Sequence, residues 1–384
     1  MSLGTRPTII HAADFAAPYS GNFIASLSAL ASSCEDRGWE LLLALPSTAA
    51  KRDWCARLAD IGLRVHFLTK TDSVIRAAME LAQLAHASEA VLIHTHFSFY
   101  DVPGALASHL LRLRGHRVRV VWHYHSDFPV TLRLKRRVKN LVKYRLLGRD
   151  AHIIAVSDHL RTSAIEAGFS SARAHTVCNG IDLARVSHTR RPPSQVREDL
   201  RIPAEIPLVL LFGWEPVIKG VDLALEAIER IVASGQQVLL GVVGREALHK
   251  FIAQRTANEP IPWLHILKPL EDVGDLYKIA SVFLSASRRE GFPYSVGEAL
   301  ASKLPAVVSD LPGVAWARNT PGVVFFPVED SHALEAAIRE VLAWDPADRS
   351  HRVQLGYSYV KQHLSIESWA CTICDLYEEL LVLQ

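Results

Sequence analysis

The chain has 384 residues, of which 49% are hydrophobic, and its 42 lysines and arginines against 40 aspartates and glutamates give a net charge of +2. This length predicts two globular domains, and the balanced charge argues against a partner bound mainly through bulk charge, such as nucleic acid. The five cysteines are dispersed and odd in number, which favours a reducing compartment over a disulfide framework. Cys371 and Cys374 have C-x-x-C spacing, but they lie in a helix-like segment without a second pair. We interpret them as packing residues rather than a metal or redox site.

Short apolar runs typical of buried strands alternate with longer amphipathic segments along the first half of the chain. The strand candidates are 8–10, 41–45, 65–68, 91–94, 118–122 and 153–156. Continuous apolar runs separated by helices predict a parallel sheet covered on both faces. The first run is too short for a signal peptide, and no window is long enough to span a membrane. We therefore expect a cytoplasmic protein.

Paired prolines and mixed charges interrupt the alternation at 186–204 and indicate a linker or domain junction. The alternation then restarts, with a helix candidate over 220–233 and strand candidates at 207–212, 238–243, 264–267, 282–284 and 306–308. The sequence thus predicts an α/β protein of two doubly wound, Rossmann-like domains. Ligands of such sheets bind beyond the carboxyl ends of the strands, so two such domains facing each other would enclose a cleft.

Two glutamates, Glu290 and Glu298, flank a turn-rich segment between a strand candidate and a helix candidate. A helix N-terminus favours phosphate through its free N–H groups and its dipole, and Tyr294 and Ser295 can donate such groups here. Glu298 can accept hydrogen bonds from the vicinal hydroxyls of a ribose, and Glu290 can contact a second polyol or a developing positive charge. Acidic residues also suit helix starts in general, which explains Glu298 alone but not Glu290.

With EGFPYSVGEALASKLPAVVSDLPGV around them, the two glutamates form an E-x7-E pattern that resembles the signature of the retaining glycosyltransferases of family four. That family has the two-domain GT-B fold. Further segments follow in the family's order and spacing: AVSDHLRTSAIEAG (155–168), VCNGIDLARV (177–186), KGVDLALEAI (219–228) and GVVFFPVEDSHALEAAI (322–338). The resemblance covers nearly the whole chain, most strongly 150–340. It implies an acceptor-binding domain over 1–187, a nucleotide-sugar-binding domain over 188–364, and a final helix within 365–384 that packs back toward the N-terminal domain.

The resemblance assigns Glu298 to the nucleotide ribose and Glu290 to the donor sugar. It also implies a segment G-R-x-x-x-x-K-G whose basic pair neutralises the donor diphosphate. Lys219 matches the lysine of this segment, but Trp214 stands in place of the arginine. Losing bidentate guanidinium donors is not a small change. Lys219 with the helix N-terminus would have to suffice, or another arginine would have to compensate; the candidates are Arg245, Arg288 and Arg289.

The donor-binding residues we expect are Gly213, Trp214, Arg245, Phe292, Tyr294, Ser295 and Glu298, with Lys219, Glu290 and His125 as catalytic residues. His125 follows a strand candidate and aligns with the family's active-site histidine. The resemblance implies that it hydrogen-bonds a sugar hydroxyl and supports the oxocarbenium-like state. Asp127 would orient His125 or the acceptor.

Further candidates for the acceptor side are Gly21 and Asn22, between the first strand and a helix, and His96 at the end of the fourth strand candidate. Gly21 and Asn22 would equally suit a plain helix start. His94 and His96 leave a metal pair open, but the sequence shows no third ligand, and we expect no metal.

The segment TLRLKRRVKNLVKYRLLGR (131–149) is strongly basic and carries apolar residues at helical spacing. It is a candidate for peripheral contact with an anionic membrane, such as the inner face of a cell membrane, or with a phosphorylated acceptor. A solvated helix face is the plainer interpretation.

Together these features favour a metal-independent hexosyltransferase without a cofactor. Its donor would be a UDP-sugar first and a GDP-sugar second. Its acceptor would be a glycan, a lipid-linked saccharide or a small metabolite. The chain has no ATP P-loop, no G-x-G-x-x-G and no D-x-D. Two alternatives stay open. Trp214 is compatible with a non-catalytic homologue that binds a sugar nucleotide or glycan, and PYSVG (293–297) is one residue from the G-x-S-x-G of a serine hydrolase that would use Ser295.

Overall fold

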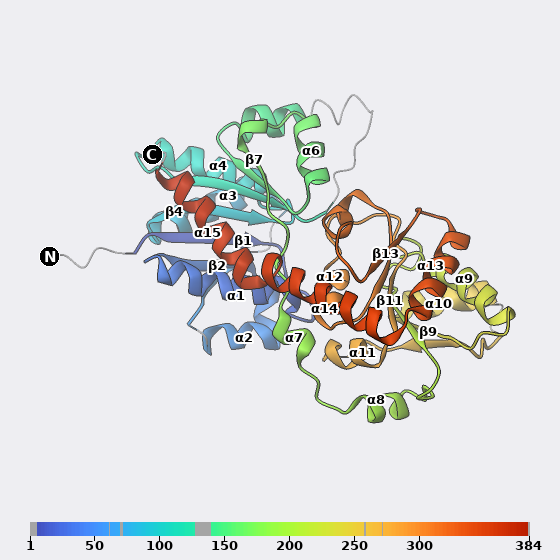
Figure 1. Ribbon diagram of the computed structural model, residues 1–384. Helices are drawn as coiled ribbons and strands as arrows, with labels where there is room; N and C mark the ends of the chain where they lie inside the picture. Colours follow the sequence, from blue (N-terminus) through green and yellow to red (C-terminus); the bar gives the residue numbers. More distant parts are fainter. Residues whose placement is uncertain are drawn as a thin grey trace. The chain divides into compact units, whose positions relative to one another are not determined.

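The computed structural model describes residues 6–60, 62–69, 72–126, 140–256, 259–270 and 272–382. The chain divides into two compact units, shown in Figure 1. Unit 1 comprises Met1–Gly180 and Ile366–Gln384, and unit 2 comprises Ile181–Ser365. Each unit contains a parallel β-sheet with helices, which confirms the predicted pair of doubly wound α/β domains.

In the described part of unit 1, a seven-stranded sheet has the order β3-β2-β1-β4-β5-β6-β7. The strands are β1 (Thr8–Ala13), β2 (Glu40–Pro46), β3 (Arg64–Leu68), β4 (Ala90–His96), β5 (Arg119–Tyr124), β6 (His152–Ala155) and β7 (Ala174–Thr176). The helices are α1 (Gly21–Asp36), α2 (Asp53–Asp60), α3 (Val74–Ala87), α4 (Asp101–Arg112), α6 (Asp158–Glu166) and α15 (Ile366–Val382), with the short 3₁₀ helices η1 (Ser47–Lys51) and η3 (Ser171–Arg173) and the π-helix η2 (Val142–Leu147).

Both faces of the unit 1 sheet are buried, as the continuous apolar runs predict. Neighbouring strand residues point to opposite faces, so Ile9 of β1 packs in one core with α1 and α15, and Ile10 packs in the other with α3. The last helix therefore belongs to unit 1. There the buried Cys374 Sγ lies 3.8 Å from Cys34 Sγ of α1, while Cys371 is exposed. The C-x-x-C spacing thus places one thiol in the core and the other in solvent.

In the described part of unit 2, a six-stranded sheet has the order β10-β9-β8-β11-β12-β13. The strands are β8 (Leu208–Phe212), β9 (Leu239–Val243), β10 (Leu264–Leu267), β11 (Val282–Ser285), β12 (Ala306–Ser309) and β13 (Val323–Phe326). The helices are α7 (Leu183–Ser187), α8 (Pro193–Asp199), α9 (Val221–Ala233), α10 (Glu246–Thr256), α11 (Val273–Ile279), α12 (Tyr294–Ala301), α13 (Ser331–Ala343) and α14 (Pro346–His363), with the turn η4 (Pro312–Ala317). The proline-rich interruption at 186–204 contains α8, which begins at Pro193, where a proline needs no N–H partner.

In each sheet the strand order reverses beside the first strand of the unit, between β1 and β4 in unit 1 and between β8 and β11 in unit 2. Open α/β sheets bind ligands at such switch points, beyond the carboxyl ends of the strands. Among the described helices, none is both long and apolar enough to cross a bilayer.

Candidate functional site

The switch point of unit 2 brings together two of the predicted catalytic residues. Lys219 lies in the loop after β8, and Glu290 lies in the loop after β11. Lys219 Nζ donates to Glu290 Oε1 over 2.6 Å, and Ser287 Oγ donates to the same oxygen over 2.7 Å. Both side chains of the ion pair are partly buried. In the described part of the chain, Glu290 Oε2 has no hydrogen-bond partner, so the carboxylate keeps an accepting oxygen.

The backbone conformation and the crowded surroundings at position 220 explain why a glycine follows Lys219. The φ of Gly220 is +64°, and a Cβ built on it would lie 2.0 Å from the carbonyl oxygen of Ala286, at the end of β11. A side chain would therefore push the two loops apart. A backbone hydrogen bond of 2.8 Å from Arg288 N to Ile218 O also joins them. Together these contacts hold Lys219 at Glu290.

Glu298 is the fifth residue of α12, which begins at Tyr294. The side chain is buried, with 4% of the residue exposed. Its Oε1 accepts a charged hydrogen bond from Arg185 of α7, and its Oε2 accepts one of 2.7 Å from the hydroxyl of Tyr277 in α11. A buried carboxylate needs such partners. Since it offers about four lone-pair sites, a ribose would have to share them.

Arg185 and Tyr277 were not among the residues expected from the sequence. Burial, and after it the negative charge of Glu298, raise the pKa of Tyr277 well above its ordinary value, so its hydroxyl stays a donor at neutral pH. Arg185 lies in the VCNGIDLARV segment, which gave the only available signal. The pattern of apolar residues along the chain does not predict that α7 packs beside α12, which brings Arg185 to Glu298.

The surroundings differ among three residues near the start of α12, namely Phe292, Tyr294 and Ser295. Phe292 is buried and stacks on Trp316, with ring centroids 5.4 Å apart, which indicates packing. Tyr294 has its pKa raised by burial and by the charge of Glu298. In the described residues, no histidine hydrogen-bonds Ser295, so the base of a serine hydrolase is not in place.

Trp214 is 41% exposed rather than buried. The guanidinium of Arg245, which follows β9, lies 5.7 Å from its ring centroid. Arg288 has another role, because it makes a bidentate ion pair with Asp222 and a further one with Glu329. Arg289 is exposed. Of the three compensating arginines expected, Arg245 is the one that the structure places beside Trp214.

Gly213 directly precedes Trp214 and is closely packed. A Cβ on it would lie 2.8 Å from Val242 and 3.0 Å from Val221. A side chain at this position would therefore displace Val242 of β9 or Val221 of α9.

The switch point of unit 1 carries the residues predicted for the acceptor. Gly21 opens α1 with φ +56°, and Asn22 beside it is buried. His125 follows β5 and is half-buried. Asp127 lies outside the described residues. His96, the last residue of β4, is fully buried and hydrogen-bonds His125, so it supports this histidine rather than facing an acceptor.

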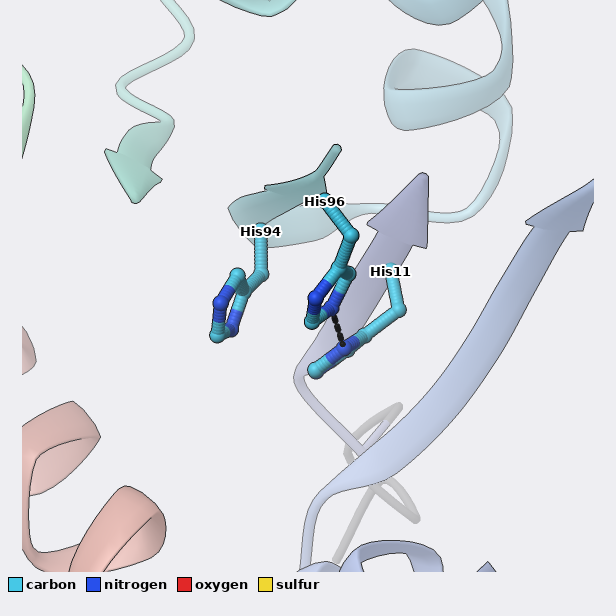
Figure 2. Close-up of side chains that lie close together, drawn as sticks. All are labelled: His11, His94 and His96. Carbon is cyan, nitrogen blue, oxygen red and sulfur yellow. Dashed lines mark hydrogen bonds between the residues drawn. The ribbon is translucent and has the colours of Figure 1, made fainter. Parts of the chain in front are cut away.

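His125 belongs to a cluster of histidines that the sequence did not predict. Figure 2 shows His11 of β1 beside His94 and His96 of β4, with Nδ1 of His11 3.0 Å from Nε2 of His96. One ring nitrogen from each of these three residues lies within 4.8 Å of the other two, and the same holds for His96, His123 and His125. The expectation that His94 and His96 lack a third nearby ligand is therefore wrong. The reason is that β1, β4 and β5 are adjacent in the sheet although far apart in sequence.

Both halves of the chain match known protein families. Residues 25–185 match the family described as "Glycosyltransferase Family 4", and residues 207–343 match "Glycosyl transferases group 1". The chain belongs to the family-four glycosyltransferases.

Two relatives match this chain at low sequence identity. The D-inositol 3-phosphate glycosyltransferase of Xylanimonas cellulosilytica is 26% identical over 60% of this chain, which spans only 58% of that protein. The lipopolysaccharide core biosynthesis mannosyltransferase LpcC of Rhizobium leguminosarum bv. viciae is 28% identical over 71% of this chain and 82% of its own length.

Solved structures match over nearly the full length. A glycosyltransferase from Rickettsia africae ESF-5 has a TM-score of 0.82 at 15% identity and covers 98% of this chain and 99% of its own. Anabaena Alr3699/HepE in complex with UDP has a TM-score of 0.78 at 19% identity and covers 97% and 100%. These likenesses establish the GT-B fold.

Proposed function

We propose that this family-four member is a retaining hexosyltransferase that uses a nucleotide diphosphate sugar. The observation that carries the proposal is the pairing of Lys219 with Glu290 at the switch point of unit 2. A cation and a carboxylate at that edge suit the two parts of such a donor, an anionic diphosphate and a hydroxyl-rich sugar.

Lys219 would neutralise the departing diphosphate. Its ammonium group has three N–H donors, and Glu290 accepts one, which leaves donors for phosphate oxygens. Arg245 beside Trp214 would supply the second cation that the family's arginine provides elsewhere. The N–H groups at the start of α12 would add to the same field. We therefore propose a transfer that requires no metal ion.

Glu290 would hold the donor sugar through its second oxygen, and Glu298 would hold the nucleotide ribose. The base is uridine in our proposal, with guanosine second, because the structurally similar Anabaena protein was solved with UDP. The acceptor hydroxyl would attack from the side of the leaving phosphate, which can take the proton itself. This front-face route needs no separate carboxylate base.

We assign the acceptor to unit 1, where Gly21, Asn22 and His125 lie at the switch point. Asp127 remains part of this proposal from the sequence. In the structure the His125 ring is bonded to His96 and to the Asn179 side chain, so a sugar hydroxyl would have to displace one of them or use the backbone. A glycan or a lipid-linked saccharide is the acceptor class we favour, since one relative is named for lipopolysaccharide core biosynthesis.

The segment 131–149 is proposed as a peripheral membrane contact for a lipid-linked acceptor. In its described part, Leu141, Val142 and Leu146 are exposed apolar side chains on a basic stretch. Co-sedimentation with anionic vesicles but not neutral ones would support this, and equal recovery with both would oppose it.

The test of the proposed function is transfer from UDP-hexoses to saccharide acceptors, with the product's anomeric configuration read by NMR. Retention of the donor's α configuration supports the proposal, and inversion contradicts it. Trp214 favours one second candidate, a homologue that binds sugar nucleotides without turnover. Donor binding with no transfer to any tested acceptor would favour that candidate.

A further inference from the structure

Five histidines and one tyrosine of unit 1 form a continuous hydrogen-bonded chain that ends at His125. In order, the members are His123, His94, Tyr377, His11, His96 and His125. They come from β4, from β5 and the residue after it, from β1, and from α15, the last of the described helices. The chain thus connects the C-terminal helix to the residue that we place at the acceptor.

Each link joins a specific pair of atoms. On the side toward His125, the Tyr377 hydroxyl lies 2.9 Å from His11 Nε2 and His11 Nδ1 lies 3.0 Å from His96 Nε2. The last link joins His96 Nδ1 and His125 Nε2 at 3.1 Å. On the other side, the Tyr377 hydroxyl hydrogen-bonds His94 Nδ1, and His94 Nε2 lies 3.2 Å from His123 Nδ1.

The rings are neutral at physiological pH. Burial lowers the pKa of His11 and of His125 to about 3, and it lowers the pKa of His94, His96 and His123 well below the ordinary value. A neutral imidazole has one N–H and one lone pair. Every ring in the chain must therefore donate at one nitrogen and accept at the other.

The end of the chain at His123 selects the direction of donation. Its Nε2 is buried, and no partner for it exists among the described residues. An orphaned buried N–H is rarer than an acceptor left without a donor. This Nε2 then carries the lone pair, and Nδ1 of His123 donates to His94.

Donation then runs in one direction through the whole chain. His94 Nδ1 donates to the Tyr377 oxygen, and the single proton of that hydroxyl goes to His11. His11 donates from Nδ1 to His96, and His96 donates from Nδ1 to His125 Nε2.

A metal ion explains the cluster less well. An ion bound by imidazole lies in the plane of each ring, along its lone pair, at about 2.0–2.1 Å for zinc. The rings of His94 and His96 are stacked at 4.5 Å with an interplanar angle of 13°, and those of His123 and His125 at 4.3 Å and 22°. Nearly parallel stacked rings direct their lone pairs along separate planes and share no common ligand point.

We propose that Tyr377 is a positioning residue that fixes the tautomer and orientation of His125 through His11 and His96. In this arrangement His125 carries its proton on Nδ1 and accepts at Nε2. The consequence for sugar transfer rests on the proposed function, but the tautomer itself does not.

The test is ¹⁵N NMR of the full-length protein labelled at histidine, with the His125 signals assigned from the spectrum of His125→Gln. The wild type is expected to show His125 as a single Nδ1–H tautomer. In Tyr377→Phe the ring keeps its packing but the link is lost, and His125 is expected to show a mixture of tautomers. Where activity is available, kcat should fall about fivefold, as for one lost hydrogen bond, with the donor KM unchanged.

Tyr144→Phe is the matched control, because it removes the hydroxyl of another buried tyrosine of unit 1, outside the chain. It should leave the tautomer of His125 unchanged. Three results would overturn the proposal: an Nε2–H tautomer in the wild type, a His125 spectrum that Tyr377→Phe leaves unaltered, or a stoichiometric metal ion in the purified protein. None of them bears on donor binding in unit 2, so failure here is distinguishable from failure of the proposed function.

Discussion

Lys219 and Glu290 are 71 residues apart, yet their side chains meet at 2.6 Å where β8 and β11 end. Both residues lie in loops at the carboxyl edge of the unit 2 sheet, and Gly220, which has no side chain, allows these two loops to approach each other. Partly buried charge at a switch point is what a site for a charged ligand requires.

Lys219→Ala should weaken nucleoside diphosphate binding by roughly 10-fold to 100-fold, because a charged hydrogen bond to phosphate is worth about 1.5–3 kcal/mol. Titration calorimetry with UDP measures the change. Lys250→Ala is the control, since Lys250 is an exposed lysine of the same unit, paired with Glu246 on α10. Equal loss in both variants would mean that only the net charge of unit 2 matters.

Glu298→Ala should weaken donor binding more than it slows transfer, because ribose contacts hold the donor in ground and transition states alike. Tyr277→Phe should weaken donor binding less, by about fivefold, through one lost hydrogen bond to the carboxylate. KM and kcat for the donor, measured separately, check both. A variant with normal KM and low kcat would move Glu298 from the ribose to the chemical step.

Arg245→Ala should lower donor affinity if this arginine replaces the one absent at position 214. Trp214→Arg in the Arg245→Ala background should then restore part of the affinity, as the guanidinium returns to the family's position. Arg255→Ala serves as a comparison, because Arg255 also lies over an aromatic ring, Phe251, but on α10. Unchanged UDP affinity in Arg245→Ala would leave Lys219 as the sole cation.

The free energy of unfolding of unit 1 should fall as pH falls from about 6.5 toward about 3. The pKa of His11 and of His125 is about 3 in the folded protein and 6.5 without burial, so between these values the unfolded chain binds more protons. Each such histidine contributes a slope of about 1.4 kcal/mol per pH unit in that window. Above 6.5 the contribution is complete and constant.

Urea denaturation at several pH values measures this slope. His11→Gln should reduce it by the share of one histidine. The same slope in the wild type and in His11→Gln would show that this ring is not buried neutral in solution.

The sequence predicted most strands in their order along the chain, and it showed the E-x7-E segment, because these features depend on local pattern and spacing. The sequence did not identify β7, which has three residues, or β13, whose residues are mostly half-buried. It named Lys219, Glu290 and Glu298, but it missed Arg185 and Tyr277, which reach Glu298 from other helices. His11 and Tyr377 were equally unreadable, because their contact spans 366 residues of sequence and depends on how α15 returns to the sheet.

The most direct measurement is calorimetry of the wild type with UDP, GDP and ADP. We expect selective binding of one diphosphate, UDP first, that is clearly weakened in both Lys219→Ala and Glu298→Ala. Binding of none of the three to the folded protein would contradict it, and Trp214 would then mark a donor site that no longer functions.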